Sequence, residues 1–267
     1  MSLPPPDNLF TIESLPIRTM VFFDLDNTLF DHQKSLHNAI SVVRTMFPPL
    51  RATPLDVLIE KYNEALNLVY NKYLRNEIRH DDQDAEKVKL FFKSLDLEEP
   101  DSECIARFRS VYKTRYRMER SSTPGIIQAL TKLRANGYRT AIITNGPTES
   151  QIEKAKVIGV FDLVECVITS QEAGHPKPDA RIFQYALEKL ELEPINVYMV
   201  GDSVEADIKG AFDAGITPIL YSPASESSLE VLFGREIPVI RHFDQLLMVL
   251  EPTLDSSSDP DYPRQGT

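Results

Sequence analysis

Short apolar runs that alternate with segments of helical length constrain this chain more than any other feature of its sequence. The first run follows Thr19 and reads Met-Val-Phe-Phe-Asp-Leu, which is rich in residues that favour β-strands. Near-continuous apolarity, without alternation, is typical of strands buried on both faces of a parallel sheet. Five later runs resemble the first, at residues 138–143, 163–168, 197–200, 216–221 and 237–240.

The segments between these runs predict helices that connect parallel strands. Alternation of strand and helix favours right-handed βαβ units and therefore a doubly wound, Rossmann-like α/β sheet. Gly137, Gly159 and Gly215 lie just past expected helix ends, where glycine is the preferred C-terminal residue. The expected helices cover residues 126–135, 149–157, 180–190 and 204–214.

One long stretch interrupts the alternation and predicts a second domain. Residues 31–123 contain no strand-like run, and we interpret them as an all-helical cap inserted into a core formed by residues 19–30 and 124–251. Residues 1–18 are expected to be a flexible segment, and residues 252–267, rich in Ser, Asp and Pro, to be disordered. Apolar residues recur at three- and four-residue steps in the inserted stretch, at Leu55, Leu58, Ile59, Tyr62, Leu66, Val69, Tyr70 and Tyr73.

Composition excludes several kinds of partner. The chain has 40 acidic residues against 29 basic ones, a formal net charge of −11, whereas nucleic acids and anionic membranes reward clustered Lys and Arg. No apolar stretch approaches the 18 residues that a membrane span needs. Cys104 and Cys166 form no CxxC pair and suit a reducing compartment. We expect a soluble, cytoplasmic protein without nucleic-acid or membrane partners.

The residues most suited to chemistry follow the predicted strands, where an open α/β sheet places its active crevice. Asp24 and Asp26 come directly after the first run, and residues two apart share a face of an extended strand end. Two close carboxylates repel each other unless a cation lies between them or their roles divide into nucleophile and proton donor. The alternative is a strand that ends in turn-forming Asp and Asn.

Three later strand ends add further polar groups. Thr144 and Asn145 follow the second run, although Asn-Gly is also a common turn. Lys177 lies between two prolines, although a lysine in a surface loop is also common, and Asp179 is placed to cap the next helix. Asp202 follows another strand and Asp207 lies one turn into a helix, so both can reach a hard cation such as Mg²⁺.

In combination these residues resemble the four motifs of the haloacid dehalogenase-like (HAD) superfamily. Its DxDxT motif is similar to Asp24-Leu-Asp26-Asn-Thr28, and its T/S and K motifs are similar to Thr144 and Lys177. Its acidic loop is similar to Gly201-Asp202-Ser-Val-Glu-Ala-Asp207. The helical insertion resembles the C1 cap of subfamily I. Residues 167–215 look similar to N-acylneuraminate-9-phosphatase-like and nucleotidase-like members.

The resemblance implies a phosphatase that hydrolyses a small-molecule phosphate monoester. Asp24 would attack phosphorus and form an aspartyl-phosphate, and Asp26 would protonate the leaving oxygen and then activate water. Thr144, with backbone amides around Asn145, would hold the phosphoryl oxygens, and Lys177 would neutralise their charge.

The resemblance also implies Mg²⁺ as the cofactor. The ligands would be the carboxylates of Asp24 and Asp202 and the backbone carbonyl of Asp26. Asp207 would act directly, through water, or by orienting Lys177. Haloacid dehalogenases have no acid at position 26, so Asp26 favours phosphoryl chemistry over dehalogenation.

Two other functions stay open from the sequence. A phosphomutase would share all four motifs, and a product assay would separate it from a phosphatase. A non-enzymatic HAD scaffold is disfavoured because every reactive group is retained. The expected partner is a small phosphorylated metabolite, and the oligomeric state cannot be predicted.

Substrate choice is expected to come from cap residues near the hinges. The candidates are His32, Gln33, Lys34, Ser121 and Ser122. A dense basic run is either an attractor of anionic substrate or a solvated helix face, and it comprises Arg107, Arg109, Lys113, Arg115, Arg117 and Arg120.

Overall fold

A mostly parallel sheet forms one part of the molecule. The computed structural model describes residues 19–75 and 77–250, so the predictions for residues 1–18 and 252–267 lie outside the described residues. The strand order is β3-β2-β1-β4-β5-β7-β6, and every neighbouring pair is parallel except β6 and β7. The strands are β1 (Met20–Phe23), β2 (Arg139–Thr144), β3 (Val167–Thr169), β4 (Val197–Gly201), β5 (Thr217–Tyr221), β6 (Leu229–Leu232) and β7 (Arg235–Ile240).

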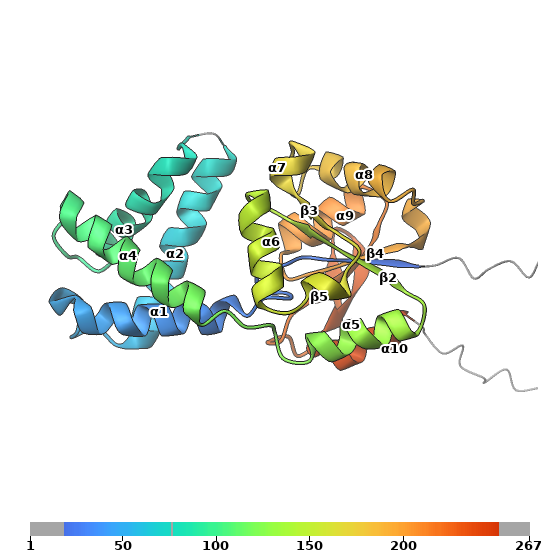
Figure 1. Cartoon of the computed structure of the whole chain (residues 1–267), viewed down its shortest axis with the longest axis horizontal. Coiled ribbons are helices and arrows are strands. Elements are labelled where there is room, and N and C mark those ends of the chain that lie inside the picture. The colour runs from blue at the N-terminus through green and yellow to red at the C-terminus, as the bar shows by residue number, and fades with distance from the viewer. Residues whose placement is uncertain (1–18, 76, 251–267) are drawn as a thin grey trace, which may run out of the picture.

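Helices cover both faces of this sheet, as Figure 1 shows. Val21 and Phe23 of β1 pack into the apolar cluster on one face, whereas Met20 and Phe22 pack into the cluster on the other. The first face is covered by α5 (Ile126–Ala135), α6 (Thr148–Val157) and α10 (Leu246–Leu250). The second is covered by α8 (Ala180–Lys189) and α9 (Gly210–Asp213), with the short α7 (Ser170–Ala173) beside α8. The prediction of a doubly wound α/β sheet is confirmed.

Four helices form a separate body beside the sheet (Figure 1). They are α1 (His32–Met46), α2 (Leu55–Leu74), α3 (Gln83–Ser94) and α4 (Ser102–Met118), and we call them the helical block. Their buried apolar residues, among them Leu36, Tyr62 and Phe108, form a cluster that shares no member with the two sheet clusters. The chain leaves the sheet after β1 and returns where Phe30 bridges Ser122.

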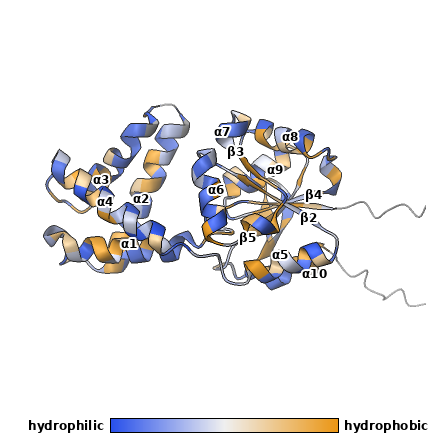
Figure 2. Cartoon of the chain, in the orientation of Figure 1, coloured by the Kyte–Doolittle hydropathy of each residue, from blue (hydrophilic) through white to orange (hydrophobic). Residues whose placement is uncertain are grey.

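Helices in both parts are amphipathic, with hydrophobic and hydrophilic residues on the same helix (Figure 2). Asp179 accepts a hydrogen bond from the backbone N–H of Arg181 at 3.0 Å and begins α8, as its position predicts. None of the helices described between residues 19 and 250 has the length and apolarity needed to cross a membrane.

The structure differs from the sequence prediction in three places. The run 163–168 is a strand only from Val167, because Leu163 closes the 3-10 turn η3 (Phe161–Leu163). The hairpin strand β6 was not predicted, since its apolar side chains Leu229 and Val231 are exposed at a sheet edge. The predicted helix 204–214 begins as a π-helical segment, η5 (Val204–Lys209), before α9. Further 3-10 turns are η1 (Pro48–Leu50), η2 (His80–Asp82), η4 (Pro194–Asn196) and η6 (Phe243–Gln245).

Candidate active site

The candidate site lies where β1 and β4 are neighbours in the sheet. The connection from β1 leads toward β2 on one side, and that from β4 leads to β5 on the other, which makes this the switch point of the fold. The backbone N–H of Asp24 donates to the carbonyl of Val200 at 2.9 Å, so the carboxyl ends of β1 and β4 lie side by side. A cavity of about 840 Å³ opens here. All the predicted site residues line it: Asp24, Asp26, Thr144, Asn145, Lys177, Asp202 and Asp207.

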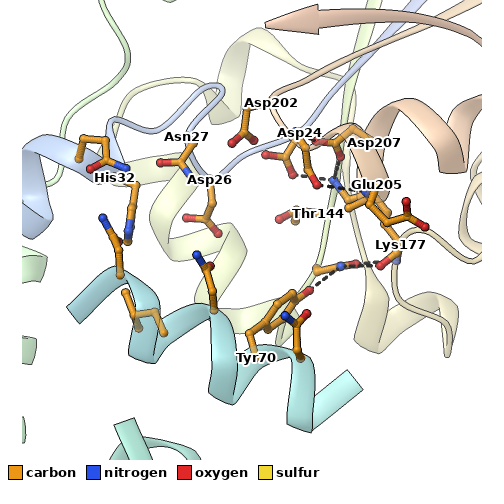
Figure 3. A pocket seen from close by; sticks show the side chains of 18 of the residues that line it. Asp24, Asp26, Asn27, His32, Tyr70, Thr144, Lys177, Asp202, Glu205 and Asp207 are labelled. Atoms are coloured by element: carbon orange, nitrogen blue, oxygen red, sulfur yellow. Dashed lines mark hydrogen bonds and ion pairs between the residues drawn. The ribbon is translucent and has the colours of Figure 1, made fainter. Parts of the chain in front are cut away.

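The ammonium of Lys177 connects two of the carboxylates (Figure 3). Its Nζ lies 2.6 Å from Oδ1 of Asp24 and 2.6 Å from Oδ1 of Asp207, and it donates to the carbonyl of Ile143 at 2.8 Å. Lys177 is 2% exposed, and although burial lowers its pKa, the two carboxylates raise it further, to well above its usual value. The lysine is therefore a fixed positive charge beside Asp24.

Asp24, Asp202 and Asp207 form an acidic cluster with more negative charge than Lys177 neutralises. One carboxylate oxygen from each lies within 4.8 Å of the others. Burial, with neighbouring carboxylates, raises the pKa of Asp24 well above its usual value and that of Asp202 to about 7. A divalent cation would relieve this repulsion, and oxygen-only donors suit a hard cation. The residues present therefore fit a metal ion.

Gly201, the last residue of β4, makes this close arrangement possible. A Cβ atom added to it would lie 2.3 Å from Cγ of Asp207, so a side chain would displace that carboxylate. Asp207 is 1% exposed, and its Oδ2 accepts a hydrogen bond from the N–H of Ser203 at 3.0 Å. Both oxygens of Asp207 thus have partners, Lys177 on one and Ser203 on the other.

Asn145 joins the loop after β2 to the loop that carries Lys177. Its Oδ1 accepts from the backbone N–H of Lys177 at 2.8 Å, and its Nδ2 donates to the carbonyl of the same residue at 3.0 Å. The Nδ2 also donates to the hydroxyl of Tyr70 at 2.7 Å. Thr144, which ends β2, is 1% exposed and lines the cavity beside Asn145.

Lys154 on α6 is a site residue that sequence analysis missed. Its Nζ lies 2.5 Å from Oδ1 of Asp26 and 5.2 Å from the ring centre of Phe30. Burial raises the pKa of Asp26, but the ion pair with Lys154 outweighs it, so the net shift is downward. The pKa of Asp26 is therefore lowered whereas that of Asp24, two residues away, is raised. No sequence signal marks Lys154, because it lies outside all four motifs, in a helix that has other charged residues on both sides of it.

The helical block supplies the opposite wall of the cavity. Of the five expected hinge residues, His32 and Gln33 line it, whereas Lys34, Ser121 and Ser122 are not among its lining residues. The Nδ1 of His32 lies 2.5 Å from the hydroxyl of Tyr116. Sequence analysis missed the polar residues that α2 contributes, which are Asn63, Asn67, Tyr70 and Asn71.

The basic run of α4 does not line this cavity. Arg109 and Lys113 instead pair with Asp84 of α3, Arg109 at 3.0 Å. Arg120 lies 3.4 Å from Glu153 of α6. The lysines that line the cavity are instead Lys87, Lys154 and Lys177, of which the sequence analysis identified only Lys177.

The chain belongs to the haloacid dehalogenase-like hydrolase family, whose model matches residues 19–215. Glyceraldehyde 3-phosphate phosphatase of Pyrococcus furiosus is 32% identical over 238 residues, which cover 87% of this chain and 92% of the relative. Ribulose-1,5-bisphosphate 5-phosphatase of Halopiger xanaduensis is 29% identical over 222 residues, or 78% of this chain and 87% of the relative.

A solved structure shows the same fold. The magnesium-bound HAD-hydrolase YfnB of Bacillus subtilis superposes with a TM-score of 0.69 at 20% identity, covering 87% of this chain and 98% of that one. Neither the two relatives nor this structure is described as an N-acylneuraminate-9-phosphatase, so that finer likeness stays a prediction.

Proposed function

We propose that this protein is a Mg²⁺-dependent phosphatase that hydrolyses a small-molecule phosphate monoester. The observation that carries the proposal is the buried cluster in which Lys177 contacts Asp24 and one carboxylate oxygen each of Asp24, Asp202 and Asp207 lie close together. Asp24 lies in the cluster with Lys177, and Asp26 pairs with Lys154. A carboxylate held beside a fixed cation suits a nucleophile toward phosphorus, and Asp26, which lies outside the cluster, can take the separate role of proton transfer. The phosphatase names of the two relatives agree with the proposal.

In the first step, a carboxylate oxygen of Asp24 attacks phosphorus, and the bond from phosphorus to the ester oxygen breaks. The leaving oxygen takes a proton from the carboxyl of Asp26, so an alcohol leaves and an aspartyl-phosphate forms. In the second step, water attacks the same phosphorus and gives its proton to Asp26. Inorganic phosphate leaves and the carboxylate of Asp24 is restored.

The surrounding groups hold the phosphoryl oxygens in both steps. Lys177 neutralises their charge, and its rigid contacts to Asp207 and to the carbonyl of Ile143 keep it in place. Thr144 and the backbone near Asn145 supply hydrogen bonds. Because both oxygens of Asp207 have partners, we assign it chiefly the role of orienting Lys177.

The residues that would hold Mg²⁺ are Asp24, Asp202 and the backbone carbonyl of Asp26, with Asp207 close by. When bound, the ion would neutralise phosphoryl charge and relieve the repulsion within the acidic cluster. We further propose that residues 31–123 act as a cap, which excludes water from a core of residues 19–30 and 124–251.

Phosphate release from a panel of phosphate esters tests the proposal. We expect turnover with Mg²⁺, loss of turnover with a chelator, and loss by more than about a thousandfold in Asp24→Asn. Asp213→Asn is the matched control, because Asp213 pairs with Lys209 outside the cavity.

Two results would overturn the proposal. One is a folded, magnesium-loaded protein that releases phosphate from no ester. The other is conversion of a sugar phosphate into its isomer without free phosphate, which would identify a mutase.

A further inference from the structure

The stripe of α2 that lines the cavity is polar except for Leu66. Asn63, Asn67 and Asn71 follow one another at four-residue steps, and Tyr70 lies beside them, so all four share a helix face. A different stripe of the same helix is buried among the other helices of the block. That apolar stripe comprises Leu58, Tyr62, Ala65 and Val69.

Residues of this polar stripe lie near both the Lys177 loop and His32. Near its C-terminal end, the hydroxyl of Tyr70 accepts a hydrogen bond from Asn145, the residue that is bonded to the Lys177 loop. Near its N-terminal end, Asn63 lies close to His32, which also lines the cavity. Figure 3 shows α2 along one side of the pocket with Tyr70 directed toward Lys177. A group leaving from a phosphoryl bound at Asp24 would therefore lie against α2.

The wall made by the helical block has little positive charge to offer a second anion. Among the described residues that line the cavity, Lys87 is the block's one lysine or arginine. Its Nζ lies 2.8 Å from Oδ1 of Asp84, so its charge is already paired. Burial lowers the pKa of His32, which favours the neutral imidazole. Across the cavity, Glu205 adds another negative charge.

Carboxamides match hydroxyl groups in hydrogen bonding. Each Asn side chain has one acceptor oxygen and two N–H donors, and a hydroxyl both donates and accepts. A carboxylate or second phosphate only accepts, so it can use the N–H groups of the amides but not their carbonyl oxygens, whereas a hydroxyl can use both. No unpaired cation on this wall would compensate for its desolvation.

We infer that the substrate carries an uncharged, hydroxyl-bearing leaving group, and that the Asn stripe of α2 discriminates against esters with a second anionic group. The inference rests on the proposed phosphatase function. It concerns only the charge and the hydroxyl groups of the leaving group.

Matched pairs of substrates test this inference. The first pair is 2-hydroxyethyl phosphate and 2-phosphoglycolate, and the second is glycerol 1-phosphate and 3-phosphoglycerate. Within each pair a CH₂OH group is replaced by a carboxylate. We expect kcat/KM to be at least about tenfold higher for the hydroxyl member of each pair.

Variants of α2 identify the residues responsible. Asn67→Lys places a cation on the stripe, and we expect it to cut the preference for the hydroxyl member at least about fivefold. Leu68→Lys is the matched control, because Leu68 is 55% exposed and does not line the cavity, so it adds the same charge elsewhere on the helix. We expect this control to leave the preference unchanged.

Hydrolysis of p-nitrophenyl phosphate distinguishes a failure of the inferred substrate preference from a failure of the proposed phosphatase function. If that ester is hydrolysed and the members of each pair react equally, or if both lysine variants shift the preference alike, the inference is wrong and the proposed function stands. If no ester is hydrolysed, including this one, the proposed function fails and the inference fails with it.

Discussion

The Nζ of Lys154 lies 2.5 Å from Oδ1 of Asp26, which places a buried ammonium on the carboxylate that exchanges a proton in the proposed reaction. Lys154 is 6% exposed and also lies over the ring of Phe30, so it cannot move away freely into solvent. The ion pair lowers the pKa of Asp26 against the opposing effect of burial. Lys154 therefore helps to set the pH at which Asp26 changes protonation state.

Replacing Lys154 with Met should move the acidic limb of the kcat–pH profile to higher pH. Asp26 must be ionised to accept a proton from water, and without the ammonium its pKa rises, so less of the base form is present at low pH. We expect a shift of about one pH unit, since one unit corresponds to about 1.4 kcal/mol of interaction. Steady-state rates between pH 4 and 8 measure it.

Two further variants control this experiment. Lys154→Arg retains a cation and should return the limb toward the wild-type position. Lys156→Met removes an exposed lysine two residues along α6 and should leave the limb in place. A limb that stays at the wild-type pH in Lys154→Met would show that Lys154 does not govern the ionisation of Asp26.

Lys177 should be a major determinant of stability as well as of activity. Its removal in Lys177→Met leaves Asp24 and Asp207 buried without their cation. Breaking a buried ion pair from one side typically costs about 3 to 5 kcal/mol. The loss should be largest at pH 8 and smaller at pH 5, because protonation relieves a buried carboxylate whose folded-state pKa has been raised.

Urea unfolding at both pH values measures this effect. Lys189→Met is the matched control, since Lys189 pairs with Glu172 at the exposed surface, and such a pair contributes about 1 kcal/mol or less. If Lys177→Met unfolds at the same urea concentration as this control, the buried cation does not stabilise the fold as argued.

The strand ends of the site were predictable because three of the four motifs directly follow or end a buried apolar run, whereas α7 separates Lys177 from β3. Asp24 follows β1, Thr144 ends β2, and Asp202 follows β4, so parallel pairing alone brings them to one edge. Lys154 was not predictable in the same way. Its contact with Asp26 depends on how α6 packs beside the loop after β1, and helical periodicity carries no information on that.

The helical block also shows what helical periodicity in a sequence does not predict. Tyr70 belongs to the apolar pattern that predicts α2, yet in the structure it lines the cavity and contacts Asn145. A helix between a core and a cavity packs one stripe of residues into the core and lines the cavity with another. Hydrophobic periodicity detects only the stripe that packs into the core. The exposed hairpin strand β6 was missed for a related reason, because it has no buried run to detect.

Asp84 should stabilise the packing of α3 against α4. Burial raises its pKa, but ion pairs with Lys113 and Lys87 outweigh that effect and hold the pKa well below its usual range. Asp84→Asn should lower the free energy of unfolding by about 1 kcal/mol at pH 7. Because the folded-state pKa is depressed, this contribution is present above about pH 4 and is lost as the pH falls further.

Denaturant unfolding from pH 7 down to pH 3 tests this prediction. The control is Asp96→Asn, at an exposed residue of the same block with φ of 54°, a backbone conformation that Asn tolerates well. A difference between wild type and Asp84→Asn that stays constant down to pH 3 would contradict the assignment to an ionised Asp84.

Mg²⁺ binding should release protons and weaken as the pH falls below 7. Burial and the charge of Asp207 raise the pKa of Asp202 to about 7, and Asp24 is raised as well, so the acidic cluster is partly protonated before the ion arrives. A carboxylate must lose its proton to bind a metal ion, so each proton released makes the apparent affinity fall about tenfold per pH unit below that pKa. Calorimetric titrations in buffers of different ionisation enthalpy count the protons.

Asp202→Asn provides the decisive comparison, because it removes one titrating group and one ligand together. We expect it to bind Mg²⁺ more weakly and to release fewer protons at pH 6.5 than wild type, whereas Asp213→Asn should match wild type on both measures. An apparent affinity that is the same at pH 6 and pH 8 would mean that the carboxylates which hold the ion are already ionised. The repulsion within the cluster would then be relieved by some other partner than the metal.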